Sequence, residues 1–123
     1  METHATVLVV EDETDVRELV YHQLALAGYT ALQAPDGESA LEVLRQRPIA
    51  LLLADFGLSG ALNGRELAEQ ARAYQPGLKV LMITGSASCE LTGLPETYAL
   101  LEKPFTSDSL LAAVQKLLRT EDM

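Results

Sequence analysis

The chain has 123 residues, of which 48% are hydrophobic, and this size and composition fit one folded domain rather than a disordered segment. Its formal net charge of −9 argues against non-specific binding to nucleic acid or to an anionic membrane, and no apolar run is long enough to span a bilayer. Because the single cysteine, Cys89, cannot form a disulfide within the chain and the N-terminus has no signal-peptide core, we expect a cytoplasmic protein with one domain over residues 1–123 and a core over about residues 6–119.

The first apolar run, residues 7–10, is continuous, as in a strand that is covered on both faces. A helix is predicted to follow it, with Thr14 or Asp15 as its N-cap and Gly28 just after its end. Apolar residues follow the i, i+3, i+4 and i+8 spacing of one helix face and are expected in the core: Val16, Leu19, Val20 and Leu24.

Residues 29–34 alternate only weakly between apolar and polar side chains, which indicates a strand at the edge of a sheet. Asp36 and Gly37 open a second predicted helix, and Pro48 closes it. Residues 51–54 form the second continuous apolar run and are typical of a central strand. A third helix is predicted next, and it ends before the turn that Pro76-Gly77 signals.

The last two apolar runs, residues 80–83 and 99–101, are separated by a segment that is hard to assign. Gly93 and Pro95 lie where the alternation of strands and helices requires a fourth helix, so we predict at most a short helix over residues 87–92. This segment is the least regular part of the predicted fold.

A final helix begins at the predicted caps Thr106 or Ser107 and carries an apolar face over residues 110–118. Strands that alternate with helices imply a parallel sheet with helices on both of its faces, so the chain is predicted to belong to the α/β class.

Reactive polar groups follow four of the apolar runs. The carboxyl ends of parallel strands meet at one edge of a sheet, where ligands bind in open α/β folds. The groups expected to gather there are Glu11, Asp12, Asp55, Thr84 and Lys103. Each of them alone would be unremarkable, and Glu11 could equally be an exposed neighbour of Asp12, but their common position at the strand ends favours a functional site.

The chemistry of these groups points to phosphoryl transfer. Carboxylates so close together repel each other, and a hard divalent cation, Mg²⁺ or Mn²⁺, would compensate them. An added ammonium group and a hydroxyl group suit a dianionic phosphoryl group, and a carboxylate can be its nucleophile. Asp55 is the predicted nucleophile because it follows the middle strand.

Four motifs, VLVVEDE, LLLADFGLSG, MITGS and LEKPF, resemble in their order the signatures of response-regulator receiver domains. The resemblance implies a flavodoxin-like, doubly wound sheet of five parallel strands in the order 2-1-3-4-5. The segment that contains LNGRELAEQARAYQPGLKV is similar to receivers of the hybrid histidine kinase type.

The resemblance also assigns roles within the site. Asp55 would accept the phosphoryl group, Asp12 would bind Mg²⁺ directly and Glu11 would bind it through a water. The backbone carbonyl of Gly57 would be a further ligand. Thr84 and Lys103 would contact the phosphoryl group, and the Lys103-Pro104 bond would be cis.

Some positions depart from the family pattern. The position three residues before the lysine, where many receivers have an aromatic switch residue, is Leu100, and Tyr98 lies two residues earlier. The loop after Asp55 is one residue longer than is common and has Ser59 in place of the usual proline. These departures leave the relay of the signal open, while the phosphorylation site is complete.

Two functions therefore compete. In the first, the chain receives a phosphoryl group from a histidine kinase or a histidine phosphotransfer protein, switches its interaction with a partner, and is not an enzyme beyond its own phosphorylation and dephosphorylation. In the second, it is a non-switching pseudo-receiver that acts as a protein-interaction module. A haloacid dehalogenase-type phosphatase is disfavoured, because Asp12 is followed by Glu13-Thr14 rather than by the second aspartate that such a site needs.

Overall fold

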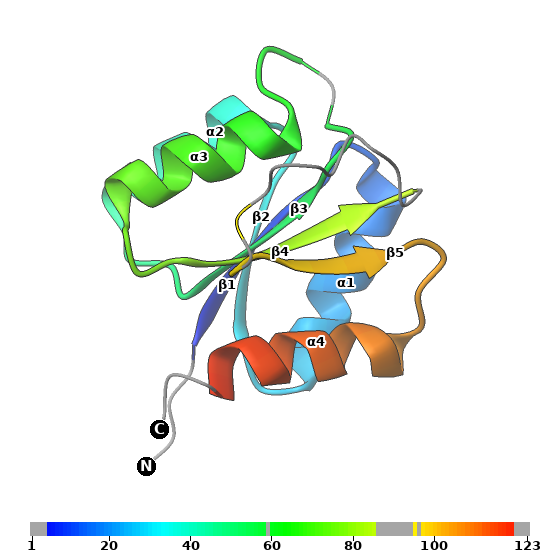
Figure 1. Cartoon of the computed structure of the whole chain (residues 1–123). Helices are drawn as coiled ribbons and strands as arrows, with labels where there is room; N and C mark the ends of the chain where they lie inside the picture. Colours follow the sequence, from blue (N-terminus) through cyan, green and yellow to red (C-terminus); the bar gives the residue numbers. More distant parts are fainter. Residues whose placement is uncertain (1–4, 59, 86–94, 96, 120–123) are drawn as a thin grey trace.

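A five-stranded parallel sheet forms the centre of the molecule in this computed structural model, which describes residues 5–58, 60–85, 95 and 97–119 (Figure 1). The strand order is β2-β1-β3-β4-β5. The strands are β1 (Thr6–Val10), β2 (Thr30–Ala34), β3 (Leu51–Asp55), β4 (Lys79–Thr84) and β5 (Ala99–Glu102). The helices are α1 (Thr14–Leu26), α2 (Gly37–Gln46), α3 (Gly64–Tyr74) and α4 (Ser107–Arg119). The predicted α/β class, strand order and flavodoxin-like topology are confirmed.

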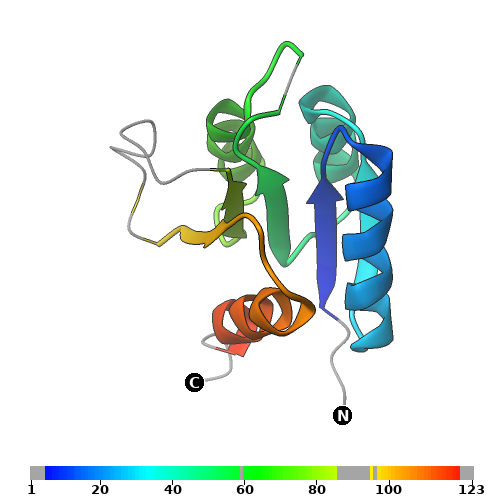
Figure 2. The same ribbon diagram turned by 90° about the vertical axis from the view of Figure 1, so that its right-hand side faces the viewer.

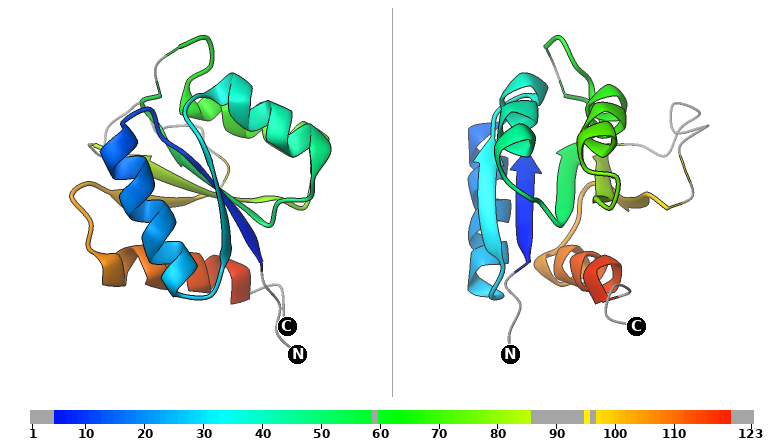
Figure 3. Two further views of the ribbon diagram at one scale, coloured as in Figure 1. Left: turned by 180° about the vertical axis from the view of Figure 1, so that it is seen from behind. Right: turned by 90° about the vertical axis from the view of Figure 1, so that its left-hand side faces the viewer.

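Helices cover both faces of the sheet. Helices α1 and α4 lie on one face, and α2 and α3 lie on the other (Figures 2 and 3). The period of two along a strand divides β1 between these layers: Leu8 and Val10 face α2 and α3, whereas Val7 and Val9 face α1 and α4. Two apolar cores result, and each one buries a helix layer against the sheet.

The burial of the strands follows the predicted pattern. Residues of β1, β3 and β4 are almost completely buried, whereas the edge strands β2 and β5 keep exposed positions. Among the described residues, no helix is both long enough and apolar enough to cross a membrane.

Two predictions for α1 are wrong. Leu19 is 56% exposed, because α1 packs on β1 and the edge strand β2 and only Val20 and Leu24 of the helix are buried. The N-cap is Glu13 rather than Thr14 or Asp15, and its side chain makes no capping hydrogen bond. Gly28 does follow the helix, with a φ of 102° that suits a glycine. The short helix predicted over residues 87–92 lies outside the described residues.

The start of α3 approaches β3 so closely that only glycine fits at residue 64. A Cβ on Gly64 would lie 2.6 Å from the carbonyl oxygen of Asp55 and 2.8 Å from the Cα of Phe56. Asn63 and Glu66 form a capping box that holds the first turn in place. The helix therefore begins directly against the end of the strand that carries Asp55.

We expect the substitution Gly64→Ala to destabilise the fold by about 1–3 kcal/mol, since the added methyl group forces the backbone apart. Urea unfolding measures this loss of stability, because the variant should unfold at a lower midpoint concentration of urea than the parent. Gly77→Ala is the matched control, because a Cβ at Gly77 would meet nothing within 4 Å. Equal midpoints for the two variants would contradict the close approach.

Candidate functional site

Three carboxylates meet at the carboxyl ends of β1 and β3. These strands are neighbours, with Val10 opposite Ala54, so the residues that follow lie side by side. One carboxylate oxygen each of Glu11, Asp12 and Asp55 lies within 4.8 Å of the other two. The predicted cluster is therefore formed.

The three carboxylates of the cluster differ in their exposure, and Glu11 is not the exposed one. Glu11 is 4% exposed and Asp55 is 9% exposed, whereas Asp12 is the exposed member. Hydrogen bonds hold both the backbone and the side chain of Glu11. Its N–H donates to the carbonyl oxygen of Ala34, and its carboxylate accepts from the N–H of Glu13 at 3.1 Å. The reading of Glu11 as an exposed neighbour is wrong, because the turn after β1 folds its side chain inward.

Arg17 completes this arrangement and was missed in the sequence. Its Nη1 donates to the carbonyl oxygen of Glu11 at 2.8 Å, and its Nε donates to Oε1 of Gln33 on β2 at 3.1 Å. Arg17 is thus a positioning residue that fixes the turn between β1 and α1. The sequence shows only that Arg17 lies one helical turn after Glu13. The structure shows that the side chain of Arg17 turns back toward Glu11.

Burial raises the pKa of Glu11 to about 7. The hydrogen bond from Glu13 opposes this rise, while the nearby charge of Asp55 adds to it. A buried carboxyl group with this pKa takes up a proton near neutral pH when no cation shares the site. The cluster is therefore electrostatically strained in the absence of a cation.

The raised pKa predicts a pH dependence of stability in the metal-free protein. The unfolded chain binds the Glu11 proton less tightly, with a pKa of 4.5, so the folded state loses stability as pH rises from 4.5 through 7. In EDTA, Glu11→Gln and the parent should be similarly stable near pH 5. At pH 8 the variant should be more stable, by on the order of 3 kcal/mol. If the difference in unfolding free energy between Glu11→Gln and the parent, measured with urea, is the same at pH 5 and pH 8, the raised pKa of Glu11 is contradicted.

Lys103 reaches the cluster from the end of β5. Its Nζ donates to Oδ2 of Asp55 at 3.0 Å, and the following Lys103-Pro104 bond is cis, as expected. Burial lowers the pKa of Lys103, but its hydrogen bond to Asp55 and the charges of Asp55 and Glu11 outweigh burial, so the pKa is raised and the ammonium form is retained. The N–H of Gly57 donates to the other oxygen, Oδ1, at 2.9 Å. Both oxygens of Asp55 are therefore oriented by donors.

Thr84 is the last residue of β4 and is 5% exposed. Its carbonyl oxygen accepts from the N–H of Lys103 at 2.8 Å, which joins the ends of β4 and β5. Leu100 lies outside the cluster, within β5 opposite Met82, and is 49% exposed. Tyr98 is partly buried and packs against the core that α2 and α3 cover.

The donor set at this edge suits a hard divalent cation. The three carboxylates that meet there all offer oxygen atoms as ligands. Mg²⁺ prefers such ligands, and a cation would compensate the negative charge of the buried Glu11 carboxylate and its repulsion by Asp55. The residues present therefore fit the expected metal.

Comparison with known sequences gives a family. The model of the response regulator receiver domain matches residues 7–115. Over 115 residues the chain is 35% identical to the response regulator receiver protein CpdR of Brucella abortus (strain 2308), covering 91% of this chain and 95% of CpdR. It is 33% identical to the nitrogen assimilation regulatory protein NtrX of Azorhizobium caulinodans but spans only 26% of that protein.

Solved structures agree with this family. A CheY-like response regulator receiver domain protein from Methanospirillum hungatei JF-1 superposes with a TM-score of 0.88, at 27% identity over 98% of both chains. The receiver domain of the hybrid histidine kinase CckA superposes with a TM-score of 0.78, at 33% identity over 93% of this chain and 99% of that domain. The chain belongs to the response regulator receiver domain family of two-component systems.

Proposed function

We propose that the chain accepts a phosphoryl group on Asp55 from a phosphohistidine donor. The observation that carries the proposal is the carboxylate of Asp55, which belongs to the acidic cluster and accepts a hydrogen bond from the ammonium group of Lys103 at 3.0 Å. One oxygen of Asp55 attacks phosphorus, a new P–O bond forms, and the bond from phosphorus to the donor nitrogen breaks with its electron pair on the departing imidazole.

The surrounding residues supply positioning and charge. The N–H of Gly57 holds one oxygen of the acceptor, and Lys103 pairs with the charge that the phosphoryl group brings. The hydroxyl group of Thr84 is proposed to donate to a phosphoryl oxygen. Arg17 keeps the turn after β1 in place while the charge at the site changes.

A divalent cation is part of the proposal. Asp12, Asp55 and the carbonyl of Gly57 would hold Mg²⁺ or Mn²⁺ directly, and Glu11 would act through a water. When bound, the cation supplies neutralisation of the negative charge on the cluster and the phosphoryl group. The donor would be a histidine kinase or a histidine phosphotransfer protein, and the similarity to the CckA receiver domain supports this choice.

The alternative, a non-switching pseudo-receiver, has one specific observation in its favour. Leu100 occupies the expected switch position and is half exposed, so no aromatic side chain there can report the state of Thr84. A pseudo-receiver would keep the fold and its interaction surfaces without phosphorylation.

Intact-mass measurement separates the two functions. Incubation with Mg²⁺ and acetyl phosphate should add the mass of one phosphoryl group to the protein, and excess EDTA should prevent the gain. A protein whose mass does not change with Mg²⁺ under saturating donor would instead be a pseudo-receiver.

The glycine at residue 57, beside the proposed acceptor, affects how long the phosphoryl group should persist on Asp55. Gly57 is exposed, and a Cβ there would lie 3.7 Å from Oδ1 of Asp55, an ordinary contact distance. The substitution Gly57→Met should fold normally and shield the phosphoryl group from attacking water. We expect its loss after donor removal to slow about tenfold, a barrier increase of about 1.4 kcal/mol. Phosphate release measures this, with Gly77→Met as a remote control, and an unchanged decay would refute the shielding role.

A further inference from the structure

The backbone of Glu11 is fixed on both of its sides, although this residue lies beyond the last residue of β1. Its N–H donates to the carbonyl oxygen of Ala34, at the end of β2, at 3.2 Å. Its own carbonyl oxygen accepts from Nη1 of Arg17 at 2.8 Å. Because a peptide group is planar, this second bond also fixes the plane from which the chain continues into Asp12. A side chain of α1 therefore holds the turn that carries two carboxylates of the cluster.

The guanidinium group of Arg17 is itself held in place. Its Nε donates to Oε1 of Gln33 on β2 at 3.1 Å, and the backbone N–H of Arg17 donates to the carbonyl oxygen of Glu13 at 2.9 Å. Helix α1 packs beside β2 (Figure 3), so this one side chain joins the start of α1, the end of β1 and the edge strand. The planar group directs its donors along fixed directions. Together, the bonds from Arg17 to Glu11 and to Gln33 form the Arg17 link.

The two sides of the acidic cluster are fixed by different means. Asp55 is part of β3 and is paired with Ile83 of β4, so the sheet holds its backbone. Asp12 is exposed and lies in the turn after β1, and the peptide group before it is held by Arg17. The sheet therefore positions one carboxylate, and the Arg17 link helps to position the other.

We propose that the Arg17 link sets the preference of the acidic cluster for Mg²⁺ over Ca²⁺. The inference rests on the proposed function, in which Asp12 and Asp55 hold a cation, and Arg17 is a positioning residue that does not touch this cation. Mg²⁺ requires ligands near ideal octahedral positions, whereas Ca²⁺ accepts a more irregular arrangement. A turn that is no longer fixed can adapt to Ca²⁺, but it must be ordered again to hold Mg²⁺. Breaking the link therefore costs more affinity for Mg²⁺ than for Ca²⁺.

The ratio of the two affinities separates positioning from charge and from stability. Removal of the positive charge of Arg17 would by itself strengthen the binding of any divalent cation. Mg²⁺ and Ca²⁺ carry the same charge, so this effect cancels in the ratio of Kd for Ca²⁺ to Kd for Mg²⁺. A general loss of stability also lowers both affinities by the same factor. A change in the ratio therefore reports the positions of the ligands.

Displacement of Mn²⁺ measures both dissociation constants. The electron paramagnetic resonance signal of free Mn²⁺ reports how much of this ion is bound, and titration with Mg²⁺ or Ca²⁺ displaces it. Arg17→Gln should lower the ratio about fivefold, and Gln33→Ala, which breaks one exposed bond of the link, about threefold. Arg45→Gln is the matched control, because it removes the same charge from the exposed surface of α2, and its ratio should equal that of the parent.

The double variant Arg17→Gln/Gln33→Ala tests whether the two residues form one link. Its ratio should equal that of Arg17→Gln alone, and fully additive effects would overturn the link. A ratio equal to the parent's in Gln33→Ala, which keeps every charge of the protein, would overturn the inference and leave the metal site standing. A parent that binds no Mn²⁺ would instead refute the proposed metal site and the inference with it.

Discussion

Asp12→Ala is expected to remove the stabilisation that Mg²⁺ gives to the parent protein. Asp12 contributes one of the three carboxylate oxygens that lie within 4.8 Å of one another. A ligand that binds only the folded state stabilises it by RT ln(1 + [L]/Kd), which is about 2.7 kcal/mol at one hundred times Kd. For a domain of this size that free energy corresponds to a rise in Tm of roughly 10 °C.

The same substitution should act in the opposite direction without metal. At pH 8, above the pKa of Glu11, the three carboxylates are all ionised and repel each other, so Asp12→Ala should melt above the parent in EDTA. Glu18→Ala is the control: it removes one exposed carboxylate from α1 outside the cluster. Thermal melting of the three proteins with Mg²⁺ and with EDTA measures both effects. If the parent protein has the same Tm with Mg²⁺ and with EDTA, the proposed metal site is contradicted.

The strands of the sheet could be predicted because they depend on short-range patterns, and their order could be predicted from the resemblance to receiver domains. Continuous apolar runs predicted the central strands β1, β3 and β4, and the weak alternation of residues 29–34 predicted the edge strand β2. Parallel strands place their carboxyl ends together, and the resemblance to receiver domains supplied the strand order in which β1 and β3 are neighbours, so the approach of Asp12 to Asp55 could be expected.

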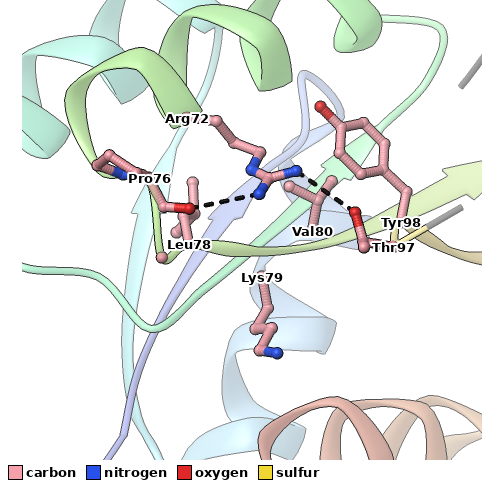
Figure 4. Close-up of a pocket in the computed structure, with 8 residues that line it drawn as sticks. Arg72, Pro76, Leu78, Lys79, Val80, Thr97 and Tyr98 are labelled. Carbon is pink, nitrogen blue, oxygen red and sulfur yellow. Dashed lines mark hydrogen bonds between the residues drawn. The ribbon is translucent and has the colours of Figure 1, made fainter. Parts of the chain in front are cut away.

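Other features depended on contacts that a pattern does not contain. The inward turn of Glu11 requires the hydrogen bonds from Arg17 and Glu13. Leu19 has helical spacing, but its exposure depends on how far α1 extends over the edge of the sheet. A cleft lined by Arg72, Leu78 and Tyr98, among others, joins the end of α3, the turn after it, the start of β4 and the residues before β5, and only their packing brings them together (Figure 4).

Asp55→Asn is expected to abolish phosphorylation while leaving the fold in place. Asparagine is nearly isosteric, and its amide oxygen can still accept from the N–H of Gly57 or from Lys103, which donate to the two oxygens of Asp55 at 2.9 and 3.0 Å. The amide oxygen is a poor nucleophile, so no acyl phosphate should form. The loss should be complete, whereas Asp108→Asn, the same change on the exposed surface of α4, should have no effect.

Intact-mass spectrometry after incubation with Mg²⁺ and acetyl phosphate tests the central claim most directly. We predict a gain of one phosphoryl group in the parent and in Asp108→Asn, and no gain in Asp55→Asn. A phosphoryl gain in Asp55→Asn equal to that of the parent would show that another residue is the acceptor and would contradict the account.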